Sequence, residues 1–293
     1  MYELAKISDC CFYINCPSKM GIYVRENGDA YLVDSGNDKD AGKKAKKILD
    51  AQGWTLKGIL VTHAHADHTG GAGYLQTQTG CKVFAGGIER AFAASPILMP
   101  VSLYGGNPWK ELCHKDMVAK PCVISDFDDP DFPAEIEVIH LGGHSPAQVG
   151  YKMPDGTVFI ADALCTERTL DKYVIVYMFD IERHLQTLDK LESMNANCFV
   201  PSHCDVSNDI KDLVRYNREK VLAIGGTLLE LCREPKNFED LLDAVFKHYD
   251  LRMTYEQHEL VGSTLKSYLT YLEKQGKMSI ELEGNYLMYQ SLV

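Results

Sequence analysis

Residues 62–71 read Thr62-His63-Ala64-His65-Ala66-Asp67-His68-Thr69-Gly70-Gly71, and the apolar run 58–62 that leads into them predicts a strand. Alternate side chains of an extended backbone project to one side, and a turn into a helix at Asp67 directs His68 toward a second point nearby. Imidazole and carboxylate groups suit zinc and similar divalent ions. The spacing therefore favours a site for two ions over a histidine-rich surface turn.

Three further ligand-type residues, His144, Asp162 and His203, follow expected strands downstream. Taken singly, a histidine at a strand end is often only a hydrogen-bonded side chain, and an aspartate there is often a helix cap. The ends of strands in one sheet can share an edge, so the joint placement of the three residues favours a metal site shared with residues 63–68.

The order and spacing of these residues resemble the five motifs of the metallo-β-lactamase superfamily over about residues 10–206. The resemblance implies an α/β fold, an αββα sandwich with metals at one edge of its two sheets, and it implies that Asp34 supports the metal-binding loop without being a ligand. The implied ligands are His63, His65 and His144 for the first ion, Asp67, His68 and His203 for the second, and Asp162 as a bridge.

This ligand set predicts hydrolysis. Two divalent ions, zinc by expectation and otherwise iron or manganese, lower the pKa of a water between them to about 7. Asp67 is the expected catalytic residue, which orients the attacking hydroxide. The expected substrate is an activated small-molecule ester, thioester, lactone or amide, and the alternative is a metal-dependent nuclease or phosphodiesterase.

Redox chemistry is a third possibility, because mononuclear-iron persulfide dioxygenases share much of the motif. Flavin-linked di-iron relatives usually carry glutamate where this chain has His65, which favours hydrolysis over dioxygen reduction. Two departures from the family pattern are the Cys204-Asp205 pair, where glycine is more usual, and Cys165 near Asp162. A thiol could join the second metal site, but we expect both cysteines to be buried packing residues.

The predicted elements of a first domain, residues 1–206, alternate short strands with helices. Residues 21–34 predict a hairpin that turns at 27–29. Further strands are expected at 58–62, 82–85, 135–141, 148–153, 157–161 and 198–200, and helices at 39–52, 69–79 and 181–194. The proline-rich segment 95–133 predicts an irregular functional loop, with Tyr104, Trp109 and residues 97–99 as candidates to line a substrate pocket and His114 as a candidate near substrate.

Residues 207–293 predict a second, helical domain. Helices are expected at 210–232, 238–249 and 255–275, followed by a hairpin of 278–282 and 286–289. This pattern resembles the winged-helix domain that some superfamily members carry, among them a β-lactamase-like endoribonuclease group. The segment holds 11 Lys and Arg against 14 Asp and Glu, and its presumed recognition helix offers only Lys266 and Lys274. It lacks the basic stripe of a nucleic-acid reader.

The whole chain carries 41 Asp and Glu against 30 Lys and Arg, a net charge of −11. Such a chain repels phosphate backbones, so a small-molecule substrate is expected as partner and nucleic acid is not. The first residues lack a signal peptide, and no apolar run approaches the ~20 residues of a membrane helix. We therefore expect a cytoplasmic protein without a membrane partner, whose C-terminal segment packs on the active-site rim or makes a homodimer contact.

Overall fold

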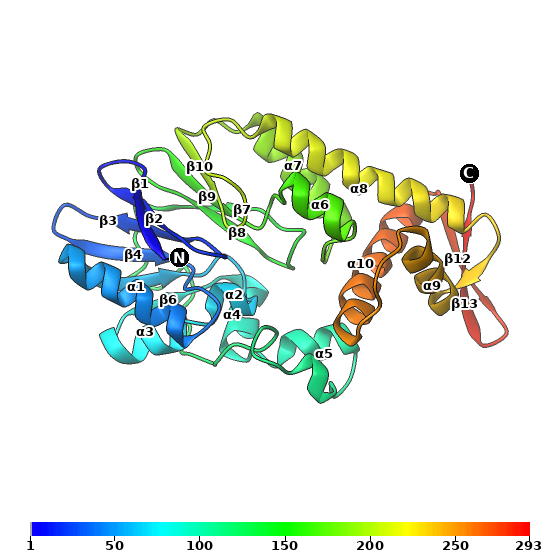
Figure 1. The fold of residues 1–293 in the computed structure, drawn as a ribbon, viewed down its shortest axis with the longest axis horizontal. Helices are drawn as coiled ribbons and strands as arrows, with labels where there is room; N and C mark the ends of the chain where they lie inside the picture. The colour runs from blue at the N-terminus through cyan, green and yellow to red at the C-terminus, as the bar shows by residue number, and fades with distance from the viewer. Residues whose placement is uncertain (1) are drawn as a thin grey trace.

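The computed structural model describes residues 2–293 and contains two facing β-sheets with helices on their outer sides (Figure 1). The first sheet has the order β1-β2-β3-β4-β5-β6, with β1 (Glu3–Lys6), β2 (Cys11–Asn15), β3 (Met20–Val24), β4 (Asp29–Val33), β5 (Thr55–Leu60) and β6 (Lys82–Phe84). The second has the order β10-β9-β8-β7, with β7 (Glu137–His140), β8 (Val149–Lys152), β9 (Thr157–Ala161) and β10 (Cys198–Pro201). The predicted mixed α/β fold is confirmed.

Parallel pairing brings the expected ligand loops together. The strands β4 and β5 are parallel with Val33 opposite Leu60, so the residues that follow both strands emerge at the same edge of the first sheet. In the second sheet β9 and β10 are also parallel, with Ala161 opposite Pro201. The residues immediately after these strands, Asp162 and the 202–203 segment, therefore leave the second sheet side by side.

The apolar side chains around the two sheets form three buried layers. Between the sheets lies a buried cluster of Tyr23, Tyr31, Leu60, Phe84, Val149, Tyr151, Phe159 and Val200. The helices α1 (Lys39–Gln52) and α3 (Ala72–Thr79) cover the outside of the first sheet through Ala45, Leu49 and Leu75. The helices α7 (Ile181–Ser193) and α8 (Lys211–Leu231) cover the second sheet through Leu188, Leu191 and Val214.

The predicted helix at 69–79 is divided into α2 (Ala66–Thr69) and α3 by Gly70 and Gly71. A Cβ atom on Gly70 would lie 2.2 Å from the carbonyl carbon of Asn37, and one on Gly71 would lie 2.3 Å from the Ser35 carbonyl oxygen. Only glycine permits this approach, which packs the turn after the histidine-rich loop against the turn after β4.

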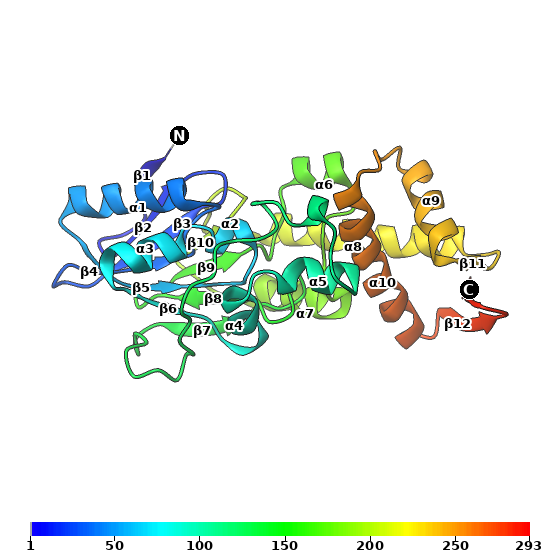
Figure 2. The ribbon, with the colours of Figure 1, turned by 90° about the horizontal axis from the view of Figure 1, so that it is seen from below.

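The prediction that residues 95–133 are irregular throughout was wrong, because α5 (Leu98–Tyr104) and the short helix η1 (Lys110–Leu112) lie within them. Pro100 falls in the first turn of α5, where no intrahelical N–H donor is needed, so proline did not prevent the helix. In Figure 2 α5 lies beside α10 (Tyr255–Lys274), which it contacts. The elements β1, α4 (Gly87–Ala94), α6 (Glu167–Tyr173) and β11 (Lys236–Asn237) were not predicted.

The C-terminal segment continues from α8 through β11, α9 (Phe238–His248) and α10 to a hairpin of β12 (Met278–Glu283) and β13 (Tyr286–Ser291). Its small sheet has the order β11-β13-β12. The core of this segment includes side chains from before residue 206, namely Ile175, Met178 and Ile181. Among residues 2–293, no helix is long and apolar enough to cross a lipid bilayer.

Candidate metal centre and substrate pocket

The loop after β5 is held by Asp34, which follows β4. The Asp34 carboxylate accepts hydrogen bonds from the Thr62 backbone N–H and the Thr62 hydroxyl, both at 2.8 Å. It also accepts one from His68 Nδ1 at 2.8 Å. The side chain is buried and lies beside residues of the expected ligand loop, so it occupies the supporting position that the sequence resemblance implied.

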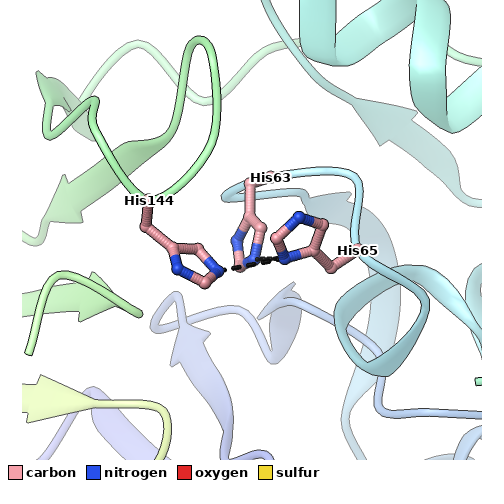
Figure 3. Close-up of side chains that lie close together, drawn as sticks. All are labelled: His63, His65 and His144. Carbon is pink, nitrogen blue, oxygen red and sulfur yellow. Dashed lines mark hydrogen bonds between the residues drawn. The ribbon is translucent and has the colours of Figure 1, made fainter. Parts of the chain in front are cut away.

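Three histidines form the first group of side chains that could hold an ion. His65 Nδ1 lies 2.9 Å from His63 Nε2 and 3.0 Å from His144 Nε2 (Figure 3). Burial lowers the pKa of His65 and of His144 to about 4. Both rings are therefore neutral at pH 7, the state in which imidazole binds a metal.

Two histidines and two aspartates form the second group. His203 Nε2 lies 3.2 Å from Asp67 Oδ2 and 3.3 Å from Asp162 Oδ2. His68 Nε2 lies 3.3 Å and 3.4 Å from the same two oxygens. Burial opposes a charge on His203, but Asp162 and Asp67 outweigh it and raise its pKa to about 10. A divalent cation would take the place of this proton between the carboxylates.

Asp162 lies between the two groups. Its Oδ2 is 3.6 Å from His144 Nε2 in the first group and within 3.4 Å of His68 and His203 in the second. Its Oδ1 is buried and has no hydrogen-bond partner among the described residues. A buried carboxylate oxygen without a partner is costly, and a bound cation would satisfy it.

Four of the five histidines among the candidate ligands share one orientation. In each of them Nδ1 makes a hydrogen bond to another protein group, and Nε2 faces the other ligands. His63 Nδ1 lies 3.0 Å from the Thr62 hydroxyl oxygen, and His68 Nδ1 donates to Asp34. His144 Nδ1 donates to the Tyr177 carbonyl at 3.1 Å, and His203 Nδ1 donates to the Pro17 carbonyl at 2.9 Å. Such partners fix the tautomer and the ring orientation of histidines that bind metals. The residues present therefore fit divalent metal ions, and each of the two groups could hold one.

Glu89, on α4, was missed by sequence reasoning and connects the two ligand loops. One carboxylate oxygen accepts from the Ala64 backbone N–H at 2.9 Å. The other accepts from the Ser145 hydroxyl at 2.7 Å and the Ala147 backbone N–H at 2.9 Å. Glu89 is 3% exposed, and a glutamate is almost never this buried unless it is paired. Its position in an unpredicted helix left no sequence signal for this role.

A cavity of about 200 Å³ opens against the candidate ligands. It is lined by His65, Ala66, Asp67, Met99, Asp116, Met117, His144, Asp162, Tyr177 and Leu260. Met99 comes from α5 and Leu260 from α10, so the segment 95–133 and the C-terminal segment both contribute to its wall. Of the predicted lining residues, Met99 is present, whereas Asp116 and Met117, close to His114 in the chain, were not predicted.

Other predicted pocket residues lie elsewhere. Trp109 packs its ring 5.1 Å from that of Tyr104 and 5.8 Å from that of Tyr255, outside the cavity lining. The His114 ring contacts the carboxylate of Glu256 on α10 and does not line the cavity. These residues join the 95–133 segment to the C-terminal segment.

Two cysteines, Cys204 and Cys165, lie close to the candidate ligands in the sequence. Cys204 donates its thiol to the Leu164 carbonyl, and burial raises its pKa to about 12. The pKa of the Cys165 thiol is also raised, by burial and by Asp162. Cys10, Cys11 and Asp155 form another close group, but the Cys11 thiol donates to Asp155, which also accepts from Thr157.

The comparison with protein families decides the assignment of the fold. The family model described as the metallo-beta-lactamase superfamily matches residues 18–203, more than half of the chain. The chain belongs to the metallo-β-lactamase superfamily. The matched range contains all seven candidate ligands.

The curated relatives of this superfamily member include proteins with two different names. It is 30% identical over 142 residues to a protein of Methylobacillus flagellatus named hydroxyacylglutathione hydrolase, a match that spans 48% of this chain and 45% of that protein. It is 22% identical over 270 residues to the beta-lactamase-like protein 2 homolog of Drosophila melanogaster, a match that spans 88% of this chain and 83% of the relative. The first match thus spans less than half of either protein.

Solved structures share the fold over almost the whole chain. A metallo-beta-lactamase family protein of Thermus thermophilus matches with a TM-score of 0.70 at 18% identity, over 99% of this chain and 98% of that one. A beta-lactamase domain protein of Burkholderia ambifaria matches with a TM-score of 0.69, also at 18% identity, over 99% and 93%. At this identity the likeness supports the fold alone.

Proposed function

We propose that this protein is a binuclear metal-dependent hydrolase of activated small-molecule esters, thioesters, lactones or amides. The observation that carries the proposal is the set of four histidines whose Nδ1 atoms are bound to the protein while their Nε2 atoms converge on Asp67 and Asp162. His63, His65 and His144 would hold one divalent ion, Asp67, His68 and His203 the other, and Asp162 would bridge them. Zinc suits these ligands, and so do iron and manganese.

Divalent ions held by these residues would supply a water whose pKa is lowered to about 7 and would polarise the acyl carbonyl. The protein's own part is positional. Asp67 lies both in the ligand group and in the cavity lining, where its carboxylate can accept a hydrogen bond from the attacking water and orient it. Tyr177 holds the His144 ring through its carbonyl group and contributes to the cavity wall.

The C-terminal segment has the chain order helix, strand, helix, helix and hairpin, which supports the further proposal of a winged-helix-like unit. Leu260 of its α10 lines the cavity, so we assign the unit to closing the substrate pocket rather than to reading nucleic acid. The metal-dependent nuclease is the competing function, and a polyanion would need a cationic groove beside the metals.

The test compares hydrolysis of a panel of small thioesters and lactones with cleavage of single-stranded RNA, at ~0.15 M salt, a concentration that weakens the contacts between cationic side chains and phosphates on which nucleic-acid binding depends. We expect zinc-loaded protein to hydrolyse members of the small panel, with activity removed by a chelator and restored by zinc. Metal-dependent RNA cleavage without activity on the small panel would overturn the proposal in favour of the nuclease.

A further inference from the structure

The wall of the cavity combines apolar side chains with negative charge. Beyond the candidate ligands, its lining consists of Ala66, Met99, Met117, Tyr177, Leu260 and one carboxylate, Asp116. Among residues 2–293, no lysine or arginine lines this cavity. A substrate carboxylate bound there would therefore have no cationic side chain as partner.

The charged groups around Asp116 add to this acidity. His114 lies 3.7 Å from Asp116 and is paired with Glu256 of α10, so its ring lies between two carboxylates. Lys115, the neighbouring cation in the sequence, lies 3.7 Å from Asp38, another carboxylate. The side chain of Asp116, which lines the cavity, is 61% exposed, and that of Glu256, which does not line it, is 42% exposed.

The sequence match to a hydroxyacylglutathione hydrolase does not extend across this wall. Met99 and Leu260 are 161 residues apart in the chain, more than the 142 residues of the match, so that match cannot contain both. A glutathione thioester carries two carboxylates, which anion-binding side chains would have to accommodate. Specificity depends on such contacts and not on the fold.

We infer that the cavity selects acyl compounds whose group beside Met99, Met117 and Leu260 is apolar and carries no negative charge, and that it discriminates against glutathione thioesters. This inference rests on the proposed hydrolase function and names its substrate class. Apolar contact with the two methionines and Leu260 favours an apolar group. Like charges placed together at a binding surface disfavour an anionic group, such as the glutathione carboxylates, beside Asp116.

The experiment uses zinc-loaded protein and two thioesters with the same acyl group, one of glutathione and one of the neutral thiol N-acetylcysteamine. We expect kcat/KM to favour the neutral thioester by about tenfold or more, as charge mismatch at an interface predicts. The variant Asp116→Lys should shift this ratio toward the glutathione thioester. The matched control Asp9→Lys makes the same charge change at a side chain that is 99% exposed and paired with Lys6, and it should leave the ratio unchanged.

A second measurement separates this inference from the proposed function. Calorimetry gives the Kd of the two corresponding S-alkyl thioethers. These compounds lack the acyl carbonyl of the thioesters and therefore cannot be hydrolysed. Tighter binding of the neutral thioether supports the inference, and tighter binding or faster turnover of the glutathione compound overturns it. If neither thioester nor any other member of the small panel is hydrolysed, the hydrolase proposal fails, and the thioether affinities still decide the charge preference.

Discussion

Asp34 and Ala161 adopt φ angles of +63° and +51°, in the left-handed region that residues other than glycine rarely occupy. Asp34 binds Thr62 and His68, and Ala161 directly precedes Asp162. Such conformations cost about 1–3 kcal/mol each and gather at functional sites. The ends of β4 and β9 thus carry local backbone strain, and each places a carboxylate, Asp34 or Asp162, at the candidate metal centre.

Glu89 is expected to position the ligand loops without touching substrate. Glu89→Ala leaves three donors without their acceptor, so we expect zinc affinity to fall by about 10–100-fold, the usual loss when a group that orients metal ligands is removed. Glu89→Gln should give a smaller loss, because the amide oxygen of glutamine can still accept the hydrogen bonds made to one of the two carboxylate oxygens. The amide nitrogen cannot accept those made to the other. Competition with a chromophoric chelator measures both affinities.

The control for Glu89 is Glu135→Gln, which removes the charge from a carboxylate paired with Arg25 outside both ligand groups. Metal-free thermal unfolding of each variant separates positioning from stability. An unchanged zinc affinity in Glu89→Ala would contradict the positioning role of Glu89. A loss of zinc affinity that is fully explained by a lower stability of the metal-free protein would also contradict it.

Residues close together in the sequence could be predicted as a site, and residues joined only by the fold could not. The loop 63–68 carries its own spacing, and His144, Asp162 and His203 each follow a recognisable strand. Glu89 is brought to Ala64 and Ser145 by the placement of α4, which no local pattern specified. The pocket wall likewise depends on α10 meeting α5, a contact between segments distant in the chain.

At the scale of elements, the helix α7 carries a buried histidine that no ligand role explains. His184 is 1% exposed, and neither ring nitrogen has a hydrogen-bond partner among residues 2–293. Burial, with a smaller contribution from His144, lowers its pKa to about 3. The folded protein therefore keeps this ring neutral, whereas the unfolded chain binds a proton below a pH of about 6.5.

The sign of the pH effect follows from this difference. Between pH 6.5 and 3 the unfolded state binds the extra proton, so the free energy of unfolding falls as pH falls, by about 1.4 kcal/mol per unit for one such group. His184→Leu removes the effect. We expect wild type to lose about 2 kcal/mol more stability than His184→Leu between pH 6.5 and pH 5. Equal losses in urea unfolding at the two pH values would contradict this account.

The helices and strands with strong local signals were predicted closely. The structure places α1 at Lys39–Gln52, ended by Gly53 with a φ of +72°, as its glycine stop signal indicated. The segment 95–133 was misjudged because its prolines lie where helices tolerate them, so composition alone did not separate a loop from short helices. Short edge strands such as β1 bury little apolar surface and leave little pattern to detect.

At the scale of the whole molecule, the division into residues 1–206 and 207–293 is a prediction that unfolding can test. Ile175, Met178 and Ile181 share a core with Val221 and Leu265 of the C-terminal helices, and all three are at most 4% exposed. We expect the full chain to unfold in one calorimetric transition, and the fragment 1–206 to bind a hydrophobic dye and lose fixed tertiary structure. Two separate transitions, or a fragment with native near-ultraviolet dichroism, would show two independent domains.

The central claim is that seven side chains hold two catalytic ions, and elemental analysis of the purified, zinc-reconstituted protein tests it most directly. Seven ligands exceed what one tetrahedral site uses, so we predict two ions per chain in samples that hydrolyse the small panel. In Asp162→Ala, which loses the bridging carboxylate, we predict fewer than two ions and a fall in turnover of about 10³-fold, with the fold retained by circular dichroism. Full activity with one ion or none per wild-type chain would contradict the account.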